Sequence, residues 1–230
     1  MGLHLYFTPR DAKYLLFGLI LVEILLVAIF VADALLGQPI WTIHVLFHLD
    51  GEGNIPAWFS SVQLFLIGLV FLLGGRPSKP DDRPSSLFWL IVGAGFIFLS
   101  LDEVAAIHEK LTHVLTTFAW VPRFKGDHGV WIFIYLLVGT SLCFATYRDL
   151  MAMWKRDRSA TSFLAVGMGL FLIGGVGLEI ISYQFLRSGS TPLLYQAEVA
   201  LEELLEMSGE SIMLYGILLL AQQEPGPRAS

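Results

Sequence analysis

Long runs of apolar residues dominate the chain, and six of them have the length that a helix needs to cross a bilayer. Such a helix requires about 20 consecutive, mostly apolar residues. The six runs cover about 14–36, 55–74, 87–106, 129–147, 161–184 and 198–221. The polar segment 222–230 that follows is predicted to be a disordered tail. The pattern therefore predicts an all-α fold, a polytopic membrane helical bundle of about six transmembrane helices in one domain, 1–230.

The composition agrees with this pattern. Of the 230 residues, 55% are hydrophobic and only 15% are charged, and the mean hydropathy is +0.68. Soluble domains usually carry about 25% charged residues, so the composition excludes an ordinary soluble domain. The single cysteine, Cys143, falls in the fourth run and cannot form a disulfide within the chain.

The Lys and Arg residues predict how the bundle is oriented. Loops on the cytoplasmic side of a membrane are enriched in these residues. If the N-terminus is cytoplasmic, ten of the 14 Lys and Arg lie inside, namely Arg10, Lys13, Arg76, Lys79, Arg83, Arg148, Lys155, Arg156, Arg158 and Arg228. This bias predicts that both termini are cytoplasmic, in a plasma membrane of the bacterial inner-membrane type.

In this orientation most acidic residues and histidines gather toward the outer face, because helices of alternating direction bring their polar ends to one side. The outer histidines are His44, His48, His108, His113 and His128. Charged groups within membrane-spanning segments are energetically costly and usually functional. We therefore expect a functional site near the outer face.

The segment 99–113, LSLDEVAAIHEKLTH, ends the third apolar run with several candidate ligands. If it is one continuous helix with about 100° per residue, Asp102, Glu109 and His113 lie on one stripe, within about 40° of one another. Glu103 and His108 then point elsewhere. Two carboxylates and an imidazole on one stripe are suitable metal ligands.

The sixth run contains a row of glutamates, Glu198, Glu202, Glu206 and Glu210, at steps of four. Like charges at this spacing repel one another along a helix, so they require cations, protons or water. The first two are expected to belong to a solvated helix start. Glu206 and Glu210 lie deeper and are expected to be buried.

Together these residues predict a carboxylate- and histidine-rich metal site without cysteine, which favours iron or manganese over a thiolate zinc site, although zinc is not excluded. The expected metal ligands are Asp102, Glu109, His113, Glu179, Glu206 and Glu210. Glu203 and His108 are expected to orient ligands or move protons as catalytic residues. His128, Asp50 and Glu52 are placed at the entrance, and whether they or His44 and His48 join the site stays open.

Facing helices that carry about four acids and two histidines can hold a dinuclear metal centre. The favoured function is therefore a membrane metalloenzyme, with iron in a possible dinuclear centre, that hydroxylates or desaturates a lipid or another apolar substrate. Its expected partners are this substrate, the membrane and a redox partner, and no nucleic acid. Two alternatives stay open: a metal-dependent lipid hydrolase, in which Ser60 or Ser61 could assist, and a cation- or proton-coupled transporter that uses buried glutamates such as Glu23.

Overall fold

The computed structural model describes residues 8–74, 82–187 and 191–222, and its regular elements are all helical. The helices are α1 (Pro9–Leu35), α2 (Trp41–Phe47), α3 (Ile55–Gly74), α4 (Ser86–Ala105), α5 (Ile107–Leu115), α6 (Val130–Ala145), α7 (Tyr147–Arg156), α8 (Arg158–Leu172), α9 (Glu179–Ile181) and α10 (Pro192–Ala221). A short 3₁₀ turn, η1 (Lys125–Asp127), precedes α6, and two π-helical segments, η2 (Ile173–Leu178) and η3 (Ser182–Leu186), flank α9. Most of the predicted tail lies outside the described residues.

The all-helical fold class is confirmed, and the helices are suited to a membrane. In the described part of the chain, five helical segments are long and apolar enough to cross a bilayer, and they correspond to the predicted runs near 14–36, 55–74, 87–106, 161–184 and 198–221. The fourth run corresponds to α6, which bends by 66° into α7; together these two helices make a sixth candidate span. The placement of the termini relative to the membrane stays a prediction.

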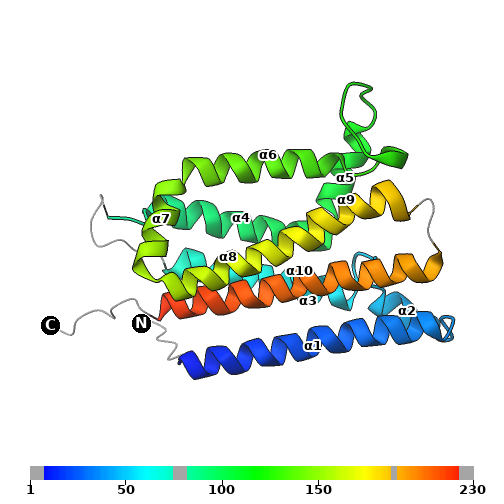
Figure 1. Cartoon of the computed structure of the whole chain (residues 1–230), viewed down its shortest axis with the longest axis horizontal. Coiled ribbons are helices and arrows are strands. Elements are labelled where there is room, and N and C mark those ends of the chain that lie inside the picture. Colours follow the sequence, from blue (N-terminus) through cyan, green and yellow to red (C-terminus); the bar gives the residue numbers. More distant parts are fainter. Residues whose placement is uncertain (1–7, 75–81, 188–190, 223–230) are drawn as a thin grey trace.

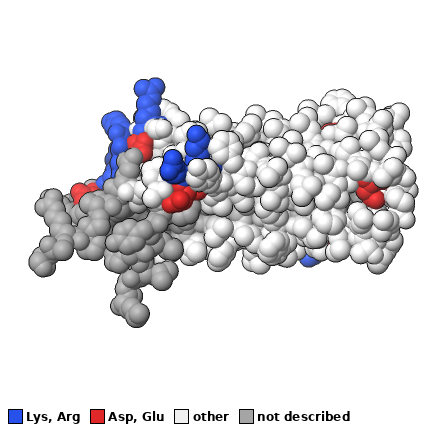
Figure 2. Space-filling model, turned by 90° about the horizontal axis from the view of Figure 1, so that it is seen from below, with Lys and Arg blue, Asp and Glu red and all other residues white. Residues whose placement is uncertain are grey.

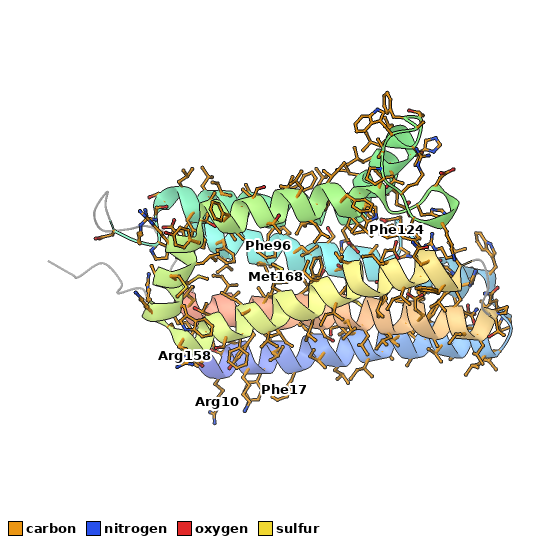
Figure 3. All side chains as sticks on the ribbon, turned by 45° about the horizontal axis from the view of Figure 1, so that its top comes forward. Arg10, Phe17, Phe96, Phe124, Arg158 and Met168 are labelled. Atoms are coloured by element: carbon orange, nitrogen blue, oxygen red, sulfur yellow. The ribbon has the colours of Figure 1, made fainter. Side chains whose placement is uncertain are left out.

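The long helices lie side by side and alternate in direction (Figure 1). We call the end where α1 begins the basic end, because Lys and Arg side chains gather there (Figure 2). The middle of the face shown in Figure 2 is largely uncharged. Arg10 and Arg158 both lie at this end (Figure 3). The opposite end, where α10 begins, is called the acidic end.

Helix α10 is the central element of the bundle. It packs against α8, against η2, against α1 and against α3. Its buried positions include both apolar residues and the carboxylates Glu198, Glu202 and Glu210. A helix that buries charged residues in this way positions them against its neighbours rather than exposing them to lipid.

Polar side chains mark the starts of several helices. The hydroxyl of Thr8 accepts the backbone N–H of Asp11, Ser85 does the same for Phe88, and the carboxylate of Asp157 caps Ala160 at the start of α8. Such caps satisfy N–H groups that have no partner within the helix. These caps help to fix where α1, α4 and α8 begin.

Glycines allow the helices of the core to approach closely. A Cβ atom added to Gly167 in α8 would lie 2.5 Å from the carbonyl oxygen of Gly209 in α10. A similar contact joins α3 and α4, where a Cβ on Gly68 would lie 2.7 Å from the carbonyl oxygen of Gly93. Small residues at such crossings are typical of membrane helices, whose association depends on close packing.

The segment 99–113 is not one helix, which corrects the prediction of a continuous stripe. Ala106 has a left-handed backbone conformation (φ 48°, ψ 45°), so α4 ends at Ala105 and α5 begins at Ile107. The carboxylate of Asp102 accepts the backbone N–H of His108 at 2.8 Å and thereby caps the first turn of α5. Helix α5 then leaves the bundle direction (Figure 1).

Candidate functional site

Five carboxylates from three helices gather in the half of the bundle toward the acidic end. Glu103 comes from α4, Glu179 from α9, and Glu203, Glu206 and Glu210 from α10. Glu103 interacts electrostatically with the three members that α10 contributes, and Glu203 and Glu206 also interact with Glu179. We call these five residues the carboxylate cluster.

The deepest member of the cluster is Glu210, whose side chain is completely buried. Its Oε1 atom accepts a hydrogen bond of 2.7 Å from the hydroxyl of Ser60 in α3. Its Oε2 atom has no hydrogen-bond partner among the described residues. A buried carboxylate oxygen without a partner is costly unless a proton, a water molecule or a cation satisfies it.

The π-helical segment η2 makes room for Glu206. Any Cβ at Gly174 or Gly175 would lie 2.8 Å from Cγ or 3.0 Å from Cδ of Glu206, respectively. The side chain of Glu206 therefore occupies space that only glycine leaves open. Short π-helical turns within α-helices occur frequently at functional sites, and here two of them flank Glu179.

The cluster lacks a compensating lysine or arginine ion pair within the described segments. No ion pair of these segments joins any of the five carboxylates to Lys or Arg. Arg187 acts electrostatically on Glu179, but its guanidinium bonds the Asp50 carboxylate at 3.3 Å. Several like charges in a low-dielectric interior require neutralisation by protons or bound cations.

His108 lies beside the cluster and is held by Asp102. Its Nδ1 atom is 3.2 Å from Oδ1 of Asp102, while the hydroxyl of Tyr135 donates to Oδ2 at 3.0 Å. Burial opposes a positive charge on His108, but the hydrogen bond and the charge of Asp102 raise its pKa above the usual value. Because Nδ1 faces Asp102, Nε2 is the nitrogen left for a ligand or a proton, an arrangement common for metal-binding histidines.

Glu52 and Asp50 lie at the rim of the cluster, in the loop that precedes α3. Loss of solvent around its carboxyl, together with the charges of Glu109 and Asp102, raises the pKa of Glu52 to about 7. Asp50 accepts hydrogen bonds from Arg187 and from the hydroxyl of Tyr195, at 2.8 Å for the latter. This loop is thus tied to the start of α10.

Between the cluster and the basic end, a second group of polar side chains surrounds the buried Glu23 of α1. The hydroxyls of Ser208 and Ser211 donate to its two carboxylate oxygens, and Ser211 also lies 2.7 Å from the side-chain oxygen of Gln63. Glu23 interacts electrostatically with Glu210. The polar interior therefore extends from the acidic end to about the middle of the bundle.

Beyond this depth the core is apolar. The buried side chains that fill the space toward the basic end belong to one hydrophobic cluster, which includes Leu64, Ile67, Phe71, Phe96, Met213, Leu214 and Ile217. Among the described residues, the next buried carboxylate toward the basic end is Asp149 of α7, which is already bonded by Arg83 and by the backbone N–H of Ser85. The described polar interior therefore reaches the acidic end and stops near the middle of the bundle.

The structure brings together only part of the predicted ligand set. Of the predicted ligands, Glu179, Glu206 and Glu210 lie in one cluster, together with Glu203, which was predicted as a catalytic residue. Glu109 and His113 are exposed on α5. The expected stripe with Asp102 fails because the chain breaks at Ala106. Asp102 itself is buried, but both of its carboxylate oxygens already have partners.

Glu198 and Glu202 also differ from the expectation of a solvated helix start. Their side chains are only 8% and 9% exposed, respectively. Glu202 interacts electrostatically with Glu179 and Glu206, so it extends the cluster toward the acidic end. The packing of η2 and η3 against α10 explains this burial, since a Cβ at Gly174 would lie 2.8 Å from the backbone oxygen of Glu202.

Glu103, which is a member of the cluster, and Ser60, which bonds Glu210, were not among the predicted ligands. A signal for Glu103 was available. Gly93, Phe96 and Ser100 form the buried face of α4, and Glu103 continues that row by one more step of three. Ser61 on α3 bonds Ser100 at this interface, 2.8 Å from its carbonyl oxygen.

The remaining histidines have partners of other kinds. His44 pairs with Asp33 at 3.0 Å, and its ring centroid is 4.8 Å from that of His48. His128 stacks on Tyr183, with 5.1 Å between ring centroids. Across the described ranges, no group of three or more His, Cys, Asp or Glu side chains is arranged to hold a metal ion.

The comparisons identify the family of the chain but not its activity. Residues 18–221 match the family described as "Domain of unknown function (DUF8692)", and the chain belongs to this family. Comparisons with curated proteins and with solved structures found no match. The function must therefore be argued from the site.

Proposed function

We propose that this protein is a membrane-embedded metalloenzyme whose carboxylate cluster binds divalent metal, in a possible dinuclear centre, and which oxidises a lipid or another apolar substrate. The observation that carries the proposal is the group of five carboxylates from three helices that form no ion pair with Lys or Arg among the described residues. The unpartnered Oε2 atom of the buried Glu210 leaves room for a further partner, which is a cation in this proposal and would otherwise be a proton or a water molecule.

The donor set fits a hard or intermediate metal ion. Oxygen ligands with one imidazole suit magnesium, manganese or iron, and the absence of cysteine from this group disfavours a thiolate site. The side chains do not surround a common point as they stand, so binding requires Glu103, Glu203 and Glu206 to rotate about their side-chain torsions. A pair of iron ions bound in this way would supply oxidative chemistry, with O₂ as the oxidant and a redox partner as the electron donor.

The residues of the chain have distinct roles in this proposal. Glu103, Glu203, Glu206 and Glu210 would hold the metal, together with Glu179, and Ser60 would orient Glu210. His108 would bind metal or move a proton through Nε2, while Asp102 fixes the orientation of its ring. In this scheme, Asp102 is a positioning residue rather than a ligand.

The location of the cluster favours an enzyme over a transport path. A transporter needs polar groups that reach both faces of the membrane, whereas the core between Glu23 and the basic end is apolar. If the basic end faces the cytoplasm, as the positive-inside rule predicts, the cluster faces the outer side. Proton- or cation-coupled transport remains the second candidate, because Glu23 and its serine partners lie in the middle of the bundle.

Metal retention in matched variants tests the proposal. We expect Glu206→Gln and Glu103→Gln to lose most bound metal after purification, because each removes one anionic ligand while preserving shape. Glu109→Gln is the control, since Glu109 is exposed on α5. Loss of metal in Glu109→Gln with full retention in Glu103→Gln would favour the ligand set predicted from a continuous helix, and full retention in both Glu206→Gln and Glu103→Gln would overturn the proposed site.

A further inference from the structure

An apolar cavity lies between α6 and the loop that follows α5. Its volume is about 180 Å³, and its lining includes Leu115, Trp120, Val121, Val130, Phe133 and Ile134. Among the described residues, no charged or hydroxyl-bearing side chain contributes to this lining. The cavity is open on one side, so its apolar walls are accessible to a hydrocarbon group from the surroundings.

The cavity adjoins the histidine of the proposed site. His108, Thr112 and Leu115 occupy one face of α5, at spacings of four and three residues. The hydroxyl of Thr112 accepts the backbone N–H of Trp131 at 3.2 Å and so joins this face to the first turn of α6. The ring of Trp131 contacts that of His108, with 5.0 Å between centroids.

The path from the histidine to the cavity is short. Seven residues of α-helix separate His108 from Leu115, which corresponds to about 10 Å. On α6, the cavity residues are Val130, Phe133 and Ile134. On the same helix, Trp131 contacts His108 and Tyr135 donates a hydrogen bond to Asp102. A ligand with a polar group at His108 could therefore place its hydrocarbon part in the cavity.

The same segment carries the marks of a membrane interface. Trp120 and Phe118 are 81% and 48% exposed, respectively, and aromatic side chains of this kind gather where a bilayer meets water. The loop stands off the end of the bundle beside α6, and Phe124 lies at this corner (Figures 1 and 3). Phe124 stacks on the cavity residue Phe133, with 5.3 Å between centroids.

We infer that this cavity binds a segment of the acyl chain of a membrane lipid and presents the lipid to His108. The identification of this lipid as substrate rests on the proposed function, but the binding of its chain does not require metal. The apolar lining disfavours a soluble polar ligand, which would lose hydrogen bonds to water without replacement.

The test is photolabelling of the purified protein in lipid nanodiscs with a phospholipid that carries a diazirine in its acyl chain. We expect the label to concentrate on residues 115–134 and to decrease several-fold when unlabelled phospholipid is added in excess. Ile134→Trp, which fills the cavity, should remove this labelling. Leu137→Trp is the control, because Leu137 lies on the same helix, is 67% exposed and does not line the cavity.

Two further variants keep the outcomes distinct. Phe133→Ala enlarges the cavity and should increase labelling of this segment, which separates occupancy from a folding defect in Ile134→Trp. Glu206→Gln should retain the labelling even where it loses metal, so failure of the metal site leaves this inference standing. Uniform labelling of all lipid-facing helices, unchanged by Ile134→Trp, would show ordinary bilayer lipid only and overturn it.

Discussion

The contact between α8 and α10 allows a sharp test of the packing that positions the cluster. A Cβ atom at Gly167 would lie 2.5 Å from the carbonyl oxygen of Gly209 and 2.7 Å from the backbone N of Met213. Ordinary contact begins near 3.4 Å, so Gly167→Ala requires the two backbones to separate by about 0.9 Å. Neither contacting atom belongs to a flexible side chain that could move aside.

The expected cost follows from this displacement. Overpacking of a well-packed core costs about 1–3 kcal/mol, whereas replacing a helical glycine by alanine contributes about 1 kcal/mol of stability through helix propensity. Gly169→Ala is the matched control in the same helix, because a Cβ at this position meets nothing within 4 Å. We expect Gly167→Ala to destabilise the protein and Gly169→Ala to stabilise it.

Thermal unfolding in detergent measures both effects. For a protein of this size, 1 kcal/mol corresponds to about 2–4 °C in Tm, so the two variants should differ by roughly 2–12 °C. Since α8 leads directly into η2, the displacement should also move Gly174 and Gly175 away from Glu206 and reduce metal retention. Equal Tm values for the two alanine variants would refute the close approach of α8 and α10.

Three further predictions concern the loop before α3 and the histidine. Asn54→Ala should lower the free energy of unfolding by about 1 kcal/mol in denaturant titration, because Oδ1 of Asn54 caps Ala57 at 3.0 Å; an unchanged midpoint would contradict this role. Asp102→Asn should lower the pKa of His108, as measured by NMR titration of the imidazole, because it removes the charge that favours the protonated ring; an unchanged pKa would show that Asp102 does not hold it. Because the pKa of Glu52 is raised to about 7, the folded state binds more protons than the unfolded state between about pH 4.5 and 7, so this residue's contribution makes stability fall as pH rises through that window. Glu52→Gln should flatten this part of the profile in thermal unfolding, and an identical profile would contradict the shift.

The candidate membrane spans were predictable from sequence because their signal is strong. Each of the five long helical segments overlaps an apolar run, and a continuous hydrophobic stretch of about 20 residues is rare outside membrane-spanning helices. The glutamates of α10 were also accessible to prediction, since their spacing of four places them on a slowly turning row of one helix. The finding that Glu198 is buried needed knowledge of the neighbouring helices.

The break at Ala106 could not be predicted in the same way. A left-handed alanine costs about 1 kcal/mol or more and has no sequence signal comparable to glycine or proline. Extrapolation at 100° per residue therefore carried the stripe from Asp102 to Glu109 and His113 across a break. The π-helical segments around Glu179 have a similar effect, because each disturbs the regular spacing of 3.6 residues per turn.

The most direct measurement for the central claim is the metal content of the gently purified wild-type protein, by elemental analysis, with optical spectra before and after reduction. The proposal predicts close to two iron or manganese ions per chain in a dinuclear site, with an iron site changing its spectrum on reduction. One zinc ion per chain would favour the hydrolase instead. A protein without bound metal, and unable to take up iron or manganese when these are added, would contradict the account and leave the buried glutamates as proton carriers.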